Sequence, residues 1–232
     1  MSQINIDSID GAGSFSAYVA EPGGTPRAAI IVIQEIFGVN PGIRAKCDKL
    51  AADGYLAVAP DLFWRIEPGI QLNPDVPEQM QRGLDLMGQF DQTLAIRDIE
   101  ATIRAARARL GDGGKVGVVG YCLGGRLPYM TAARTDSDAS VGYYAVGIDG
   151  LLDERHAIAN PLMLHIAGED GFVDHATQAK MHDGLDDHPK VTLHDYPGED
   201  HGFATEMGKR RSPAAADQAD ARTRAFFAEH LG

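Results

Sequence analysis

The sequence predicts an α/β protein with a mostly parallel central sheet that is covered by helices on both faces. Short apolar runs rich in valine and isoleucine alternate along the chain with longer amphipathic runs. Continuous apolar runs are typical of parallel strands that are buried on both faces. The alternation itself favours β–α–β units, whose crossover connections place helices on the faces of such a sheet.

Six apolar runs are expected to form the parallel strands. They are residues 28–33, 56–59, 115–119, 141–146, 162–166 and 191–195. Residues 14–20 alternate between apolar and polar side chains instead, which is typical of a strand with one solvated face. We therefore expect this seventh strand to be antiparallel and to lie at an edge.

Five segments with helical periodicity separate these strands. They are residues 43–53, 92–110, 123–134, 175–185 and 213–230. Asp174 and Ser212 stand where N-caps are expected, and Pro213 suits the first position of a helix. Residues 66–77 show no clear periodicity, and a long loop of this kind often lies over a functional site.

Length and composition favour a globular chain. Of its 232 residues, 44% are hydrophobic and 23% are charged, which is typical of soluble globular proteins. A chain of this length can bury a large core. We expect residues 1–232 to form a single domain.

The charge and the cysteine count exclude several classes of protein. The formal net charge is −12, and an acidic surface repels phosphate backbones, so nucleic acid is not expected as a partner. No membrane span or signal peptide is expected, because long apolar runs and a basic N-terminus followed by an apolar segment are absent from the sequence. Two cysteines, Cys47 and Cys122, favour a reduced, cytoplasmic setting.

The strongest functional signal is the segment Gly-Tyr-Cys-Leu-Gly-Gly at residues 120–125. It joins an expected strand to an expected helix, which is the context of a nucleophile elbow. Gly120 and Gly124 flank Cys122 at the positions where a side chain would obstruct the sharp turn. The helix N-terminus offers free N–H groups to an oxyanion. We therefore expect Cys122 to be the nucleophile, at a position that ordinarily carries serine.

This segment has two simpler interpretations. A lone cysteine is most often a small buried apolar residue, and a glycine-rich turn can bind a dinucleotide. The G-x-G-x-x-G spacing that a dinucleotide requires is absent from the segment. Cys47 lies in an expected helix without any such context, so we expect it to be structural.

Candidate partners for Cys122 follow two later strands. Asp170 and His201 each lie in a loop just after an expected strand, so both are expected at the carboxyl edge of the sheet. The chain order cysteine, aspartate, histidine is that of α/β-hydrolases. His201 would take the thiol proton, and Asp170 would orient the imidazole. Glu169 is the rival acid, and each of these residues taken alone suits an ordinary loop.

A fourth feature is Gln-Glu-Ile-Phe-Gly at residues 34–38. In α/β-hydrolases the loop at this place supplies one oxyanion N–H. Ile36 and Leu123 are therefore the expected backbone donors. Glu35 is unusual there: a carboxylate beside a cysteine could accept a proton or act as a gate, or be a solvated loop acid.

Together these residues resemble the dienelactone hydrolase family (carboxymethylenebutenolidases). The resemblance rests on Glu35, the 120–125 segment, Asp170 and His201-Gly202-Phe203, and it extends over about residues 14–230. It implies an α/β-hydrolase fold and hydrolysis of an enol-lactone that bears a carboxylate, in the breakdown of chlorinated aromatics. It further implies a Cys-His-Asp triad without a metal or an organic cofactor, and a glutamate that helps to activate the cysteine.

The resemblance also implies substrate contacts, and here the sequence departs from the family pattern. Family members hold the substrate carboxylate with two arginines. Arg82 is the nearest candidate for one, although an ungapped match places Met80 there. Thr205 occupies the position of the other, with Arg210 and Arg211 nearby in the sequence. The remaining implied substrate contacts are Phe37, Trp64 and Tyr144.

Three functions are compatible with these observations. The first is a cysteine-dependent hydrolase of a small-molecule lactone or ester, and the second is a broad-specificity small-ester or thioester hydrolase. The third is a thiol-based redox or ligand-binding protein without turnover. In each case we expect a monomer or a small homo-oligomer.

Overall fold

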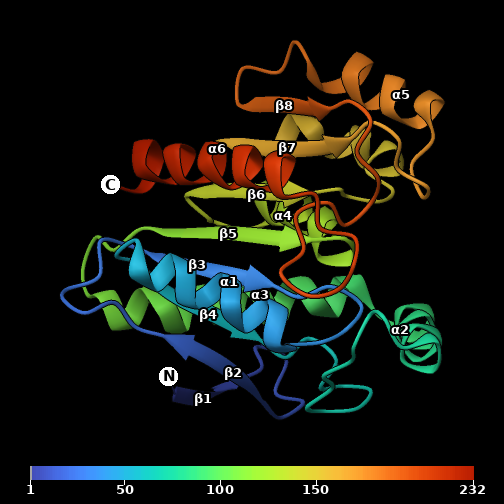
Figure 1. The fold of residues 1–232 in the computed structure, drawn as a ribbon. Helices are drawn as coiled ribbons and strands as arrows, with labels where there is room; N and C mark the ends of the chain where they lie inside the picture. The colour runs from blue at the N-terminus through green and yellow to red at the C-terminus, as the bar shows by residue number, and fades with distance from the viewer. Residues whose placement is uncertain (1) are drawn as a thin grey trace.

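The computed structural model describes residues 2–232 and has an eight-stranded sheet between layers of helices (Figure 1). In their order across the sheet, the strands are β1 (Ser2–Asp7), β2 (Ser14–Ala20), β4 (Leu56–Pro60), β3 (Ala29–Ile33), β5 (Val116–Tyr121), β6 (Ala139–Tyr143), β7 (Leu162–Ala167) and β8 (Val191–Tyr196). The six strands from β4 to β8 are paired in parallel. The predicted mostly parallel α/β sheet is therefore confirmed.

Helices cover both faces of the sheet, each over its own apolar core. On one face lie α1 (Pro41–Ala52) and α6 (Pro213–Leu231), and on the other lie α3 (Gln92–Leu110) and α4 (Leu123–Arg134) (Figure 1). The core beneath α3 and α4 also includes residues of the 3-10 helix η1 (Asp149–Ala157) and of α5 (His175–Leu185). The buried valine and isoleucine runs of the central strands thus contact helices on both sides, as their composition predicts.

The helix α2 (Pro77–Gln89) lies apart from these layers, beyond the carboxyl ends of the parallel strands (Figure 1). Its buried Leu86 packs in a small third cluster with Ile36, Phe37, Phe63 and Leu123. This cluster joins α2 to the loops that leave β3, β4 and β5. The carboxyl edge of the sheet is therefore walled by a helix as well as by loops.

Most predicted elements lie within three residues of their expected ends, and the helices at 92–110, 123–134 and 175–185 match exactly at both ends. The strand expected over 141–146 ends at Tyr143, because Tyr144 has a φ of 38° that a strand cannot contain. Asp174 caps α5 by accepting the N–H of Thr177 at 2.8 Å. Ser212 holds the N-cap position of α6 but makes no side-chain cap bond.

Three elements differ from the expectation. The strand over 14–20 is antiparallel as predicted, but it is not at the edge, because β1 pairs with its outer side. β1, α2 and η1 were not predicted. β1 is mostly polar and exposed, so its sequence lacks the apolar run of a buried strand. Within residues 2–232, no helix is long and apolar enough to cross a membrane.

Candidate active site

Cys122 lies in a sharp turn between β5 and α4. Its φ is 59° and its ψ is −120°, and such a conformation costs a non-glycine residue about 1–3 kcal/mol. Cys122 is also the N-cap of α4, so the helix N-terminus lies beside its thiol. This is the strained strand–turn–helix geometry of a nucleophile elbow, as the sequence predicted.

Close backbone contacts explain the two flanking glycines. A Cβ at Gly120 would lie 1.8 Å from the carbonyl oxygen of Gly124, and a Cβ at Gly124 would lie 2.3 Å from that of Gln34. Both obstacles are backbone atoms that cannot rotate away. A side chain at either position would therefore force open the turn that holds Cys122.

His201 and Asp170 come together from the loops after β8 and β7. Nδ1 of His201 lies 2.9 Å from Oδ2 and 3.1 Å from Oδ1 of Asp170, and both side chains are buried. The backbone N–H of Phe172 donates to Oδ1 of Asp170 at 2.8 Å and so orients the carboxylate. The side chain of Glu169 is 63% exposed. Of the two rival acids, the structure brings Asp170 to His201.

The surroundings of His201 favour the charged form of its imidazole. Burial opposes its charge, but the hydrogen bond with Asp170 and the adjacent Cys122 raise its pKa to about 10. Nε2 is buried and has no partner in hydrogen-bond geometry among the residues that the structure describes. Cys122 and His201 line the same cavity. The arrangement can therefore hold an imidazolium beside the Cys122 side chain, with Nε2 free to exchange a proton.

Two aromatic rings fix the imidazole from its sides. The ring of Tyr144 lies 5.0 Å and that of Phe172 lies 4.8 Å from the His201 ring, both in edge-to-face packing. Tyr144 is buried, whereas Phe172 is 58% exposed. A large exposed aromatic side chain is unusual, and this one is at the cavity. Phe172 therefore presents an apolar surface to any molecule that approaches His201.

Glu35 is buried at the cavity wall, so it is not a solvated loop acid. Burial raises the pKa of its carboxyl group, whereas the positive charges of His201 and Lys46 oppose the shift. The hydroxyl of Tyr144 donates to Oε1 of Glu35 at 3.5 Å. Glu35, Cys122 and His201 all line the same cavity, and the charge of His201 acts on the Glu35 carboxyl group.

The two expected oxyanion donors, Ile36 and Leu123, lie near Cys122. Ile36 follows Glu35 and lines the cavity. Leu123 is the first residue of α4, where a backbone N–H has no intrahelical partner. Both residues pack in one apolar cluster against Cys122. Their N–H groups remain the candidates for binding an oxyanion.

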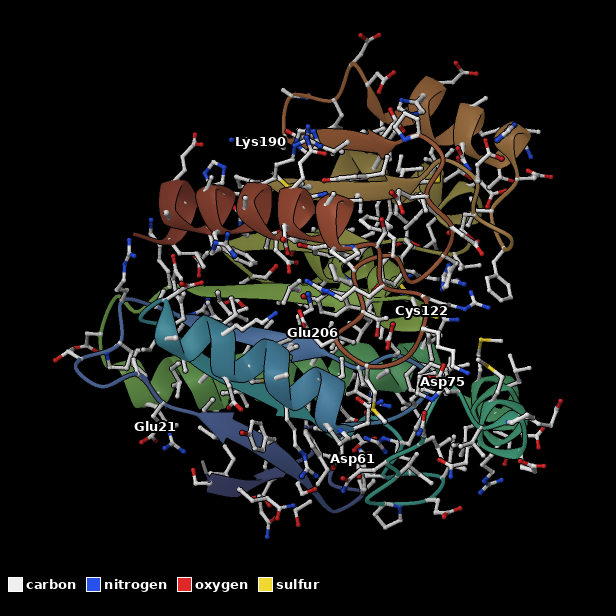
Figure 2. All side chains as sticks on the ribbon, viewed as in Figure 1. Glu21, Asp61, Asp75, Cys122, Lys190 and Glu206 are labelled. Carbon is white, nitrogen blue, oxygen red and sulfur yellow. The ribbon has the colours of Figure 1, made fainter. Side chains whose placement is uncertain are left out.

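A cavity of about 240 Å³ opens beside Cys122. Figure 2 shows Cys122 and Asp75 at the end of the sheet that faces α2. The apolar wall consists of Ile36, Phe37, Met80, Leu84, Phe172 and Met207. Pro74 and Asp75 of the 66–77 loop also line it, as the length of that loop suggested. The cavity therefore suits a small, largely apolar molecule with room for a few polar contacts.

Arg82 does not reach this cavity, although the resemblance made it a candidate for substrate binding. Its guanidinium pairs with Glu67 on the surface, and its side chain is 40% exposed. Met80 and Leu84 of the same helix line the cavity instead. Residues four apart share a helix face, and the residue midway between them points to the other side.

Of the other three implied substrate contacts, one lines the cavity and two do not. Phe37 lines the cavity. Trp64 points elsewhere, because its indole N–H donates to Asp98 at 2.8 Å and its ring stacks on Phe15. Tyr144 supports His201 and Glu35 from behind and does not line the main cavity.

Two cations, Lys209 and Arg210, line the cavity. The sequence did not assign either of them to it. Nη1 of Arg210 donates to the carbonyl oxygen of His201 at 3.3 Å, and its guanidinium carbon lies 6.0 Å from the centre of the Phe172 ring. Neither partner neutralises the charge of Arg210. The only signal in the sequence was that both cations lie shortly after His201, and the return path of the loop was not predictable. No cluster of three metal-ligating side chains occurs within residues 2–232.

Comparison with known proteins gives one consistent family. The profile of the "Dienelactone hydrolase family" matches residues 15–231. A "Putative carboxymethylenebutenolidase" of Azospirillum brasilense is 47% identical over 100% of both chains. The carboxymethylenebutenolidase of Pseudomonas putida is 37% identical and covers 97% of this chain and 95% of its own. The crystal structure of a "Putative Dienelactone Hydrolase" from Klebsiella pneumoniae superposes with a TM-score of 0.82, at 27% identity over 99% of this chain and 100% of the other.

Proposed function

This chain belongs to the dienelactone hydrolase family, and from that premise we propose that Cys122, His201 and Asp170 form a triad that hydrolyses a lactone or ester bond. At the coarser level, the chain is a carboxymethylenebutenolidase-like hydrolase of carboxylic ester bonds. One observation carries the finer proposal. His201, which is buried and paired with Asp170, lines the same cavity as the strained Cys122.

In the first step, the thiolate of Cys122 attacks the carbonyl carbon of the substrate. The carbonyl oxygen becomes negative and accepts hydrogen bonds from the N–H groups of Ile36 and Leu123. The carbon–oxygen bond of the ring then breaks, and the leaving oxygen takes the proton from Nε2 of His201. The product of this step is a thioester on Cys122, with the opened chain still attached to it.

In the second step, water hydrolyses the thioester. His201, now neutral, removes a proton from the water as its oxygen attacks the carbonyl carbon. The carbon–sulfur bond breaks, the thiolate re-forms, and the carboxylic product leaves. Asp170 holds the imidazole in the same tautomer throughout both steps, because its carboxylate accepts the Nδ1–H.

The cavity favours a substrate that is mostly apolar and carries one anionic group. An unpaired carboxylate in an apolar wall would cost several kcal/mol. Arg210 and Lys209 are the cations at this wall, and arginine binds a carboxylate with two parallel hydrogen bonds. We therefore assign Arg210 as the first partner for a substrate carboxylate.

A broad-specificity small-ester hydrolase is the second candidate. It is favoured by Thr205, a neutral residue that lines the cavity, and by the surface position of Arg82. With no cation at the cavity wall from these two family positions, discrimination for charged lactones is weaker, and neutral esters compete.

The test is hydrolysis of p-nitrophenyl acetate and of a panel of neutral and carboxylate-bearing lactones. Cys122→Ala should abolish turnover of every substrate while the protein stays folded. Cys47→Ala is the matched control, because Cys47 is fully buried in α1 away from the cavity. Activity of Cys122→Ala within a few-fold of the wild type would contradict the triad. The lactone panel then separates a carboxylate-selective enzyme from a broad one.

A further inference from the structure

A buried lysine lies behind the site and is not used by the proposed chemistry. Lys46, on α1, is 5% exposed. Its Nζ donates to both carboxylate oxygens of Asp220 at 3.0 Å and lies 3.0 Å from Oε1 of Glu206. A buried charge is retained only where such partners compensate its desolvation. Lys46 therefore ties α1 to α6 and to the loop that precedes α6.

That loop, residues 197–212, carries much of the site. It carries His201 and contributes Thr205, Met207 and Arg210 to the cavity. Glu206 lies in its middle, and Figure 2 shows it beside α1. Its carboxylate has an exposed fraction of 11% and is the only ionic link recorded between this loop and α1 among residues 2–232. Glu206 therefore links the middle of this loop to α1.

Lys46 also contacts the strands that lead to the rest of the site. Its Nζ lies 5.1 Å from the ring centre of Tyr121 and 5.8 Å from that of Tyr143. Tyr121 directly precedes Cys122. Tyr143 directly precedes Tyr144, whose ring packs on His201. One ammonium group therefore lies against the segments that hold the proposed nucleophile, the proposed base and the residue that supports the base.

We propose that Lys46 is a positioning residue, which holds the 197–212 loop against the ends of β5 and β6 and so sets His201 relative to Cys122. This inference rests on the proposed triad. A displacement of about 1 Å in a reacting group can cost about a hundredfold in rate. Backbone N–H groups of Glu169 and Gly171, after β7, bond to Glu199 and Asp200 at the start of the loop, whereas Glu206 joins the middle of the loop to α1. Lys46 is the most buried of the cations on Glu206.

Lys49 provides a matched control within the same helix. It also pairs with Glu206, at 2.6 Å, but its side chain is 53% exposed and the recorded contacts of its ammonium group are with Glu206 alone. Exposed ion pairs contribute little to structure. Lys46→Met and Lys49→Met therefore remove the same residue type and share one partner, and only the first removes the links to Asp220, Tyr121 and Tyr143.

The experiment measures kcat and KM for p-nitrophenyl acetate and the rate of Cys122 alkylation by iodoacetamide, each per folded protein. For Lys46→Met we expect kcat to fall by about tenfold or more with KM within about threefold, and alkylation to slow, because His201 is misplaced. For Lys49→Met we expect kcat within about twofold of the wild type, as for other exposed pairs. A residue that only stabilises the fold would lower the melting temperature and leave kcat per folded protein unchanged.

Equal kcat values for the two variants would overturn the proposal, and so would a normal kcat in Lys46→Met. If Lys46→Met does not fold, Glu206→Gln replaces it, because glutamine keeps the shape of the side chain and weakens only its ion pairs. A normal kcat in Glu206→Gln would then overturn the proposal. Failure of the triad itself is a different outcome, since it appears as wild-type-like activity in Cys122→Ala.

Discussion

Arg210→Met removes the cation next to His201 and keeps most of the apolar stem of the side chain. In the structure, Arg210 lines the cavity, donates to the carbonyl oxygen of His201 and lies over the Phe172 ring. If the substrate carboxylate binds this guanidinium, the variant should have a lower kcat/KM selectively for substrates that carry a carboxylate. Arg82→Met is the matched comparison, because Arg82 is paired with Glu67 on the surface.

The magnitude follows from the exposure of Arg210. A hydrogen bond to a charged group contributes about 1.5–3 kcal/mol. Because Arg210 is exposed to water, its bond to a substrate carboxylate should contribute an amount at or slightly below the lower end of that range. We expect a loss of about 1.4 kcal/mol, or about tenfold in kcat/KM, for a carboxylate-bearing lactone. A smaller loss, shared by all substrates, is expected from the missing bond to the His201 carbonyl.

The assay compares kcat/KM for a carboxylate-bearing lactone with that for p-nitrophenyl acetate, and the quantity of interest is their ratio. Arg210→Met should lower this ratio about tenfold, and raised ionic strength should shrink the difference. Arg82→Met should leave the ratio unchanged. A ratio that is unchanged in Arg210→Met would refute the assignment of the carboxylate partner. A lowered ratio in Arg82→Met would mean that α2 turns toward the cavity when substrate binds.

Three further predictions concern the proposed acid, the buried glutamate and the imidazole. Asp170→Asn should lower kcat by about 10²–10⁴-fold, because the imidazole loses its orienting acceptor. Glu169→Gln changes an exposed side chain and should change kcat little. The opposite result in steady-state kinetics would show that the wrong acid was assigned. Glu35→Gln should change both turnover and the pH dependence of Cys122 alkylation, because it removes a titrating group from the same cavity. Superimposable alkylation–pH curves for the wild type and the variant would leave Glu35 without a role in the chemistry. The pKa of His201 is raised from 6.5 to about 10, so the stability that its charged form contributes is complete below pH 6.5 and is lost as the pH rises toward 10. The melting temperature of the wild type should therefore fall more steeply over this interval than that of His201→Gln, and parallel curves would show that the raised pKa contributes no stability.

Much of the candidate site could be predicted because its signals are local or follow from strand order. The turn at Cys122 needs glycine at 120 and 124, since the contacts that exclude a side chain arise within the turn and against β3. Asp170 and His201 were predicted to meet because the loops after parallel strands emerge at one edge of the sheet. Their contact depends also on strand order, because β7 and β8 are neighbours in the sheet.

Other features depended on packing between distant segments. The sequence could not show that α2 presents Met80 and Leu84 to the cavity and turns Arg82 to the surface, because periodicity identifies a helix face and not the neighbour that covers it. Nor could it show that Glu35 is buried, since an acid in a loop is exposed in most proteins.

The sequence by itself thus determined the α/β architecture, the elbow and the residues that gather at the carboxyl edge. Tertiary structure alone decided which cations face the cavity and that Lys46 joins Glu206 to Asp220, residues 160 and 174 positions further along the chain. The physical reason is the separation along the chain of the residues that interact. Backbone turns and strand direction are set by neighbours in the sequence, whereas the side chains that line a cavity are set by how separate loops and helices pack around it.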